Sequence, residues 1–380
     1  MGHHIPDIIC PGLGQGTRDG DPLVATIAQS TTFCRDAVGS DPEHQYSRVS
    51  NPTVAALEDA LGALENAPRA LCFATGLAAE TALFLALLRQ GDHVVCGRSV
   101  YGGTTRLLQQ VLSELGVEST FVDTTDLDAV RDAVRPETRL LFVESPANPT
   151  LDVTDIRACA DIAHRAGALL AVDNTFLTPV LQQPLDLGAD ISVYSTTKFI
   201  EGHSVALGGA IVSRDQALLD RVKFIRNCTG AIQNPFNAWL TIQGLRTLPL
   251  RIRHQSANAA EIASWLRERP EIEAVHYPTH DFGQHLGADG AVVSFEVRGG
   301  LETGRAFVER LERCTLVEHV GSTQTLITHP ASMTHADVPP EQRRAVGLGD
   351  GLLRLSVGLE PASTIIEDLE QALEVASCLV

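Results

Sequence analysis

The sequence predicts an α/β fold in which helices sandwich a mostly parallel sheet, followed by a smaller α+β domain. Between residues 71 and 194, short continuous apolar runs alternate with helical patterns, as expected for parallel strands buried on both faces. After about residue 235 the pattern changes to a long helical stretch and then to mixed strands and helices. At about 150 residues per domain, a chain of 380 residues holds two or three domains. We therefore expect an N-terminal arm at 1–50, a large domain at 51–248 and a C-terminal domain at 249–380.

The individual elements follow from local patterns. The first 50 residues lack periodicity and predict an extended arm, whereas Asn51-Pro52 is typical of a helix start and opens a helix over 53–65. In the large domain we expect strands at 71–73, 93–96, 121–122, 140–144, 168–173 and 191–194, and helices at 77–89, 103–115, 127–134 and 156–166. Beyond it we expect a helix over 235–267 interrupted near Pro249, strands at 292–297 and 353–358, and helices at 303–311 and 365–375.

Charge and composition exclude several classes of protein. The net charge is −18, which argues against a surface built for nucleic acid or for an anionic membrane. The longest apolar runs, such as 82–88, are far shorter than the roughly 20 residues that span a bilayer, and the start of the chain lacks the pattern of a secretory signal. Eight scattered cysteines contain no C-x-x-C pair, and His329 and His335 have no carboxylate at ligand spacing. We expect a cytoplasmic protein with reduced thiols and no metal site.

The candidate site lies where strands end, because an α/β sheet presents its functional loops at that edge. Asp173 ends one expected strand, and Lys198 follows the next strand. Asp173 alone is compatible with a helix cap, a metal ligand or a ribose binder. Together the two residues match a pyridoxal 5'-phosphate (PLP) site, in which a lysine forms a Schiff base and an aspartate keeps the pyridine nitrogen protonated. Tyr101 can stack on the pyridine ring, and Asn148 can hydrogen-bond its phenolate oxygen.

A phosphate site is expected beside this pair. Gly76 and Leu77 open a helix after a short strand, so their N–H groups and the positive helix end can bind an anion. A plain strand-to-helix turn is the alternative interpretation, since a single glycine is weak evidence. The hydroxyl groups of Ser195 and Thr197 lie next to Lys198 in the sequence and can complete the phosphate site.

Eight stretches of this chain resemble the Cys/Met metabolism PLP-dependent enzymes, a group that includes cystathionine γ-synthase, cystathionine γ-lyase, methionine γ-lyase and the acylhomoserine sulfhydrylases. The stretches are YSRVSNPT (46–53), FATGLAAE (73–80), YGGT (101–104), VESPANPT (143–150), VDNTF (172–176), GADISVYSTTKFIEGHS (188–204), HPASMTH (329–335) and LRLSVGLE (353–360). They occur in the family's order over nearly the whole chain. The resemblance implies the PLP-dependent transferase fold type I and a homotetramer, a dimer of dimers with shared active sites.

The resemblance also implies a role for each matching residue. Lys198 carries the cofactor, Asp173 pairs with its nitrogen and Tyr101 stacks on its ring and joins the catalysis. The phosphate is bound by Gly76, Leu77, Ser195 and Thr197. Tyr46 and Arg48 reach the phosphate of the neighbouring subunit, and Arg354 binds the substrate carboxylate in a bidentate way.

Residues 317–322 depart from the family pattern. Glu318 matches the glutamate of the cystathionine γ-synthase and γ-lyase branches. His319 replaces a serine that lies near the lysine and the substrate carboxylate, and a histidine there is bulkier and is expected to titrate near neutral pH. The run His319-Val320-Gly321 is similar to the Asn-Val-Gly of sulfhydrylases. We therefore assign Glu318 and His319 to the substrate side of the site.

The function predicted from these residues is PLP-dependent γ-elimination or γ-replacement on a C4 sulfur-related amino acid, by a cystathionine γ-lyase or cystathionine γ-synthase. O-acylhomoserine sulfhydrylase is an alternative, and methionine γ-lyase is disfavoured because Gly103 stands where those enzymes have cysteine. A nucleotide-binding oxidoreductase is an alternative of another class, but the glycine run PGLGQG (11–16) precedes any expected strand. A non-catalytic scaffold is disfavoured by the joint presence of Lys198, Asp173 and Arg354.

Overall fold

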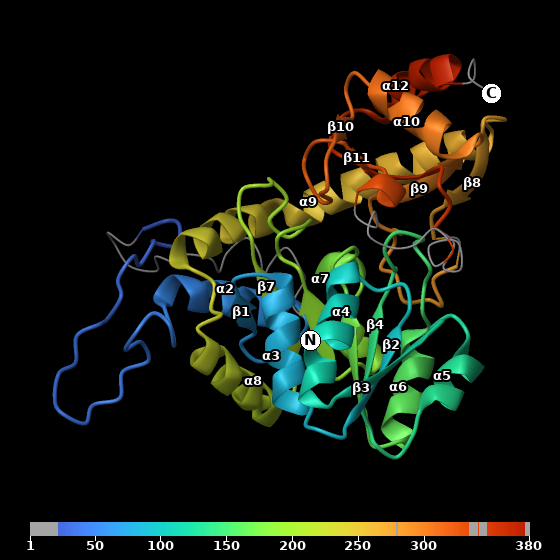
Figure 1. Ribbon diagram of the computed structural model, residues 1–380. Coiled ribbons are helices and arrows are strands. Elements are labelled where there is room, and N and C mark those ends of the chain that lie inside the picture. Colours follow the sequence, from blue (N-terminus) through green and yellow to red (C-terminus); the bar gives the residue numbers. More distant parts are fainter. Residues whose placement is uncertain (1–21, 279, 334–340, 342–347, 377–380) are drawn as a thin grey trace.

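A computed structural model describes residues 22–278, 280–333, 341 and 348–376. Figure 1 shows a larger α/β body and a smaller α+β body, with the long helix α9 (Pro235–Arg267) passing from the first to the second. This arrangement confirms the predicted fold class. The predicted boundary at residue 248 falls inside α9, so the division into 51–248 and 249–380 stays a prediction.

The larger body is built on one seven-stranded sheet. Its strands lie in the order β1 (Leu71–Phe73), β7 (Gly209–Ser213), β6 (Ile191–Tyr194), β5 (Leu169–Asp173), β4 (Thr138–Glu144), β2 (His93–Gly97) and β3 (Glu118–Val122). The five strands from β6 to β3 are parallel, whereas β7 is antiparallel to both of its neighbours. The carboxyl ends of β4, β5 and β6 therefore meet at one edge, where the predicted site residues lie.

Helices cover both faces of this sheet, because its strands are apolar on both sides. On β4, Leu140 and Phe142 pack in a core with α3 (Gly76–Leu87) and α8 (Gln216–Thr229), whereas Leu141 and Val143 pack with α5 (Leu127–Ala133) and α6 (Ile156–Arg165). Toward β7 and β6 the second face is covered by α2 (Pro52–Leu64), α7 (Thr178–Leu181) and the first half of α9. Side chains along β4 point in turn to two apolar cores, which explains why the strand sequences are continuous apolar runs.

One expectation about the long helix is wrong. The sequence predicted an interruption near Pro249, but α9 continues through this proline. A proline inside a helix loses one hydrogen bond and crowds the preceding turn. The buried side chains of Leu245, Leu248 and Ile252, which pack in the core shared with α2, hold both halves of the helix in line.

The smaller body is a five-stranded sheet with helices packed against it. Its strand order is β10 (Thr315–Leu316), β11 (Leu326–Thr328), β12 (Leu352–Ser356), β9 (Val292–Val297) and β8 (Ile272–His276). The second half of α9 packs in one core with α10 (Gly300–Arg310) and α12 (Ala362–Ala376). Strand β12 brings Arg354 toward the larger sheet.

The N-terminal arm is described from residue 22 onward, so residues 1–21 of the predicted arm lie outside the described residues. Residues 22–50 hold no helix or named strand, and a single antiparallel bridge joins Thr32 to Tyr46. In Figure 1 this segment extends as a long loop away from the body. Among the described residues, no helix has the length and apolar character needed to cross a membrane.

Candidate active site

A cavity of about 620 Å³ lies at the edge where β4, β5 and β6 end. Helix α3 begins beside it, and β12 of the smaller body lies across it. Most of the residues predicted from the sequence line this cavity: Gly76, Leu77, Tyr101, Asn148, Asp173, Ser195, Thr197, Lys198, Glu318 and Arg354. Residues separated by nearly 280 positions in the sequence are thus brought to one place.

Lys198 is half-buried in this cavity. Its Nζ lies 3.4 Å from Nδ1 of His319, which places His319 next to the predicted catalytic amine. Burial and the nearby charge of Arg354 lower the pKa of Lys198 to about 8. Burial, Lys198 and Arg354 together lower the pKa of His319 to about 4. The expectation that His319 titrates near neutral pH is therefore wrong, because two cations and a desolvated position favour the neutral ring.

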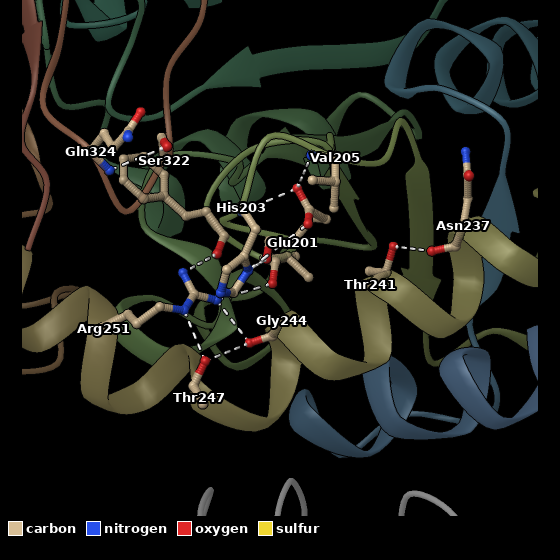
Figure 2. A network of polar contacts seen from close by, with 12 residues as sticks. Glu201, His203, Val205, Asn237, Thr241, Gly244, Thr247, Arg251, Ser322 and Gln324 are labelled. Atoms are coloured by element: carbon tan, nitrogen blue, oxygen red, sulfur yellow. Dashed lines mark hydrogen bonds and ion pairs between the residues drawn. The ribbon is translucent and has the colours of Figure 1, made fainter. Parts of the chain in front are cut away.

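The segment that follows Lys198 is fixed to helix α9 by Arg251 (Figure 2). The guanidinium group donates to the carbonyl groups of Phe199 (3.0 Å) and Ile200 (3.3 Å), and to the carbonyl of Gly244 (2.8 Å) within α9. Gly202 has φ +74°, and a Cβ at this position would clash with the same guanidinium group. Arg251 therefore holds in place the backbone that directly follows Lys198.

Two buried carboxyl groups end neighbouring strands at the cavity. Asp173 on β5 accepts a hydrogen bond from the backbone N–H of Thr175 (2.9 Å), and burial raises its pKa. Glu144 on β4 is paired in register with Asp173 and accepts from the N–H groups of Tyr101 (2.7 Å) and Asn148 (3.1 Å). Burial and the charge of Asp173 raise the pKa of Glu144. Glu144 thus fixes the two loops that carry Tyr101 and Asn148.

The first turn of α3 fits a phosphate group. The side chain of Thr75 caps the helix by accepting from the N–H of Ala78 (3.0 Å), while the first N–H groups, of Gly76 and Leu77, have no carbonyl earlier in the helix to bind. A Cβ on Gly76 would lie 3.1 Å from Cβ of Ser195, so a larger residue would be crowded where the helix start approaches that loop. Thr197 also lines the cavity, and its hydroxyl group donates to the carbonyl group of Gly208 (3.1 Å).

Tyr101 offers a flat surface to the cavity. Its ring lies against Gly103 and Leu77, because a Cβ on Gly103 would overlap the ring and would contact Leu77 at 2.9 Å. The side chain is 46% exposed, so one face of the ring is free to stack on a planar ligand. The anion site, the flat ring, the amine and the buried carboxylate together match the chemical groups of PLP.

Arg354 is buried, and within the described part of the chain it donates hydrogen bonds to three uncharged acceptors. They are Oδ1 of Asn148 (2.7 Å), the carbonyl group of His319 (3.2 Å) and the hydroxyl group of Thr328 (3.3 Å). Burial lowers the pKa of Arg354 to about 10. Because none of these hydrogen bonds goes to a carboxylate, the guanidinium group can bind an anionic part of a ligand in the cavity.

Two predicted residues lie elsewhere. Tyr46 and Arg48 line a separate hollow on the arm together with Pro235. The Arg48 guanidinium group lies 5.4 Å from the centre of the Tyr46 ring and donates to the carbonyl group of Asn227 (2.7 Å). Within one chain they do not join the cavity, so their assignment to a neighbouring subunit's phosphate stays a prediction.

Three charged residues that line the cavity were not assigned to the site from the sequence: Glu80, Arg106 and Glu144. Glu144 ends its strand in the same way as Asp173, and that parallel was a usable signal. Glu80 is an acidic residue inside the apolar run of α3, which is also a usable signal. Arg106 follows Tyr101 by about one helical turn in α4 (Gly102–Arg106), a spacing without specific information.

Comparison with known proteins defines the class of this site. The sequence profile described as "Cys/Met metabolism PLP-dependent enzyme" matches residues 14–374. A cystathionine gamma-lyase of Bacillus subtilis is 43% identical over 355 residues, covering 92% of this chain and 93% of that protein. An O-succinylhomoserine sulfhydrylase of Pseudomonas aeruginosa is 41% identical over 365 residues, covering 93% and 90%. A cystathionine gamma synthase structure from Xanthomonas oryzae pv. oryzae superposes with a TM-score of 0.95 at 38% identity, covering 100% of both chains.

These comparisons define the class: the protein is a PLP-dependent enzyme. The chain belongs to the Cys/Met metabolism PLP-dependent enzyme family. Its cofactor is pyridoxal 5'-phosphate, and its fold is the one shared by the cystathionine lyase and synthase structures. Both expectations from the sequence are confirmed.

Proposed function

We propose that this enzyme catalyses γ-elimination or γ-replacement on a C4 amino acid, with cystathionine as substrate or product. The observation that carries the proposal is the position of Arg354 at the same cavity as Lys198, with hydrogen bonds to neutral groups alone among the described residues. An α-amino acid needs a carboxylate site close to the amine that moves its proton. The related cystathionine gamma-lyase and gamma synthase are consistent with this substrate class.

Each residue then has a defined task. Bound PLP supplies an electron sink for the negative charge that develops at the substrate carbons. Lys198 carries the cofactor covalently and moves protons at its Nζ, and its lowered pKa, about 8 before the bond forms, favours the reactive neutral amine. Asp173 holds the proton of the ring nitrogen, Tyr101 stacks on the ring, and Lys198 or the Tyr101 hydroxyl group protonates the leaving group.

Glu318 favours cystathionine over simpler substrates. Its side chain is exposed and lines the cavity, so its carboxylate can face an ammonium group at the far end of a long amino acid. The second candidate function is acylhomoserine sulfhydrylation. It is favoured by the run His319-Val320-Gly321 and by the related O-succinylhomoserine sulfhydrylase.

A substrate panel tests the proposal. The purified enzyme is supplied with cystathionine, methionine, homocysteine, and O-acetyl- or O-succinylhomoserine with cysteine or sulfide. We expect 2-oxobutyrate from cystathionine, or cystathionine from an acylhomoserine and cysteine. Turnover only with an acylhomoserine and sulfide would replace the proposal by the second candidate. The Lys198→Ala variant controls for background reactions of free PLP.

We also propose that the active unit is a dimer within a homotetramer, with Tyr46 and Arg48 of one subunit serving the other's phosphate site. The support is that both residues lie on the extended arm and outside the cavity of their own chain. Mixing inactive Lys198→Ala and Arg48→Ala subunits tests this. Each mixed dimer would contain one intact site, so activity should return on mixing. If dimers shown to contain one subunit of each variant have no activity, the proposal is contradicted.

We propose a cytoplasmic location. Among the described residues, six cysteines are unbridged, and four of them are buried. Such thiols suit a reducing compartment. Cell fractionation of the host with an antibody against the enzyme would check the location.

A further inference from the structure

Gln182 is a buried amide that no step of the proposed reaction uses. It directly follows α7, is fully buried and does not line the cavity. Its Nε2 donates one hydrogen bond to the carbonyl group of Ser145 (3.0 Å) and another to Oδ1 of Asn174 (3.0 Å). Ser145 follows the last residue of β4 and Asn174 follows the last residue of β5, so one side chain joins the ends of two neighbouring strands.

This bridge lies where the backbone stops joining the two strands. Glu144 and Asp173 are the last residues of β4 and β5 that are paired in register. The N–H of Ser145 still donates to the carbonyl group of Asp173 (3.3 Å), and among the described residues no backbone hydrogen bond between the two strand ends lies beyond it. Past this point the side chain of Gln182 makes the hydrogen bonds that the backbone no longer makes.

Asn174 extends the bridge to a third strand. Its Nδ2 donates to the carbonyl groups of Thr178 (3.2 Å) and Gln182 (2.8 Å). The same nitrogen donates to the hydroxyl group of Tyr194 (3.1 Å), the last residue of β6, and that hydroxyl group donates to the buried carboxyl group of Glu65. Because the nitrogen of Asn174 points to acceptors, its oxygen is the atom that receives the amide of Gln182. The hydrogen bonds therefore specify one orientation of each amide.

Each bridged strand end is the chain neighbour of a residue that lines the cavity. The pairs are Glu144-Ser145, Asp173-Asn174 and Tyr194-Ser195. The side chains of Gln182, Asn174 and Tyr194 do not line the cavity themselves, so they act on it through the backbone. A change in the spacing of the strand ends would move Asp173 relative to Lys198, which follows β6.

We propose that Gln182 is a positioning residue for Asp173: by joining the ends of β4 and β5, it fixes where the carboxylate of Asp173 lies relative to Lys198. The inference rests on the proposed placement of Asp173 at the ring nitrogen of the cofactor. A carboxylate displaced from that nitrogen holds its proton less well, which weakens the electron sink that the cofactor supplies.

The test compares two bridges at opposite ends of the same sheet. Gln182→Met keeps a side chain of similar length but removes both donors. The matched control is His93→Met, because His93 is also buried and its ring contacts the hydroxyl groups of Thr138 (2.8 Å) and Thr120 (2.9 Å). His93 and Thr138 begin β2 and β4, at the edge away from the cavity. Both variants should shift the unfolding equilibrium toward the unfolded state by about 10- to 100-fold.

The two variants should differ in the state of the bound cofactor. Without substrate, Gln182→Met should change the visible absorption spectrum of the cofactor in the same direction as Asp173→Asn and to a smaller extent. Its kcat should fall by about 10-fold, because small displacements of reacting groups are costly. His93→Met should keep the wild-type spectrum and kcat. If Gln182→Met fails to fold, Gln182→Asn, which keeps the amide on a shorter side chain, should show a weaker change of the same kind.

Three outcomes would count against the inference. It is overturned if Gln182→Met loses stability but keeps the wild-type spectrum and kcat while Asp173→Asn changes the spectrum. It is also overturned if His93→Met shows the same spectral change as Gln182→Met. If Asp173→Asn leaves the spectrum unchanged, the proposed role of Asp173 fails and the inference fails with it.

Discussion

Two buried arginines show how differently this molecule treats charge in its structural core and in its cavity. Arg226 of α8 is 1% exposed and forms an ion pair with the buried Glu58 of α2. It also donates to the carbonyl group of Cys72 (2.8 Å) and lies 5.7 Å from the centre of the Phe73 ring. Arg354 of β12 is 5% exposed, yet among the described residues it donates hydrogen bonds to an amide, a carbonyl and a hydroxyl group and to no carboxylate.

The difference separates structural charges from functional ones. The partner carboxylate offsets part of the desolvation cost of Arg226, so this arginine joins α2 and α8 without needing a ligand. Neutral acceptors orient Arg354, and Glu144 acts on its charge without a hydrogen bond to it, so the guanidinium group remains available for an anion. Lys198 belongs with Arg354, since its Nζ also faces a neutral partner, His319.

The largest effect is expected on the cavity side, from Lys198→Ala. This change removes the amine that carries the cofactor and moves protons, so activity should fall by about 10⁴-fold, while the thermal unfolding temperature of the cofactor-free protein stays close to that of wild type. Lys198 and Lys223 are the two lysines of the sequence, which makes Lys223→Ala a matched control. Borohydride reduction should fix the cofactor to the Lys198 peptide. Fixation to the Lys223 peptide would contradict the assignment.

Substitution of the structural arginine, Arg226, should instead change the stability of the fold. Arg226→Leu leaves the carboxylate of Glu58 buried without its partner and should lower the free energy of unfolding by about 3–5 kcal/mol. The double variant Arg226→Leu with Glu58→Leu should recover much of this loss, because neither charge remains. Urea unfolding of the four proteins measures the coupling. Equal losses in the single and the double variant would mean that the ion pair has no structural role.

The sequence was sufficient to predict the elements whose structure follows from local patterns. The strands at 140–144 and 168–173 were predicted because every residue in them is apolar until the terminal acid, and parallel pairing then places Glu144 beside Asp173. Pro249 misled the prediction, because the sequence cannot show how much apolar surface α9 buries on each side of it. The neutral environment of Arg354 was also hidden, since its partners Asn148 and Thr328 come from distant loops and strands.

The Arg354→Leu variant tests whether Arg354, unlike Arg226, contributes to activity rather than to stability. Losing the carboxylate site should lower kcat/KM by about 10²- to 10³-fold. Stability should hold or rise, because a base whose folded pKa is lowered from 12.5 to about 10 destabilises the fold at neutral pH. Arg354→Lys keeps the charge but loses the planar fork, so it should restore only part of the activity. A loss of stability as large as that of Arg226→Leu would place Arg354 among the structural charges.

The smallest effect is expected at His319, the neutral partner of Lys198. Its folded pKa of about 4 means that it gives no step in the activity profile between pH 6 and 8, so His319→Asn, which retains a neutral acceptor, should keep the wild-type profile. His319→Ser should change kcat/KM by only a few fold, since the contact to Nζ is long at 3.4 Å.

A histidine with a lowered folded pKa stabilises the fold above its unfolded value of about 6.5 and loses this contribution as the pH falls toward 4. His319→Asn should therefore gain stability over wild type at pH 5 but not at pH 8, whereas equal stability at both values would show that the ring is charged or exposed and that Lys198 has a different partner.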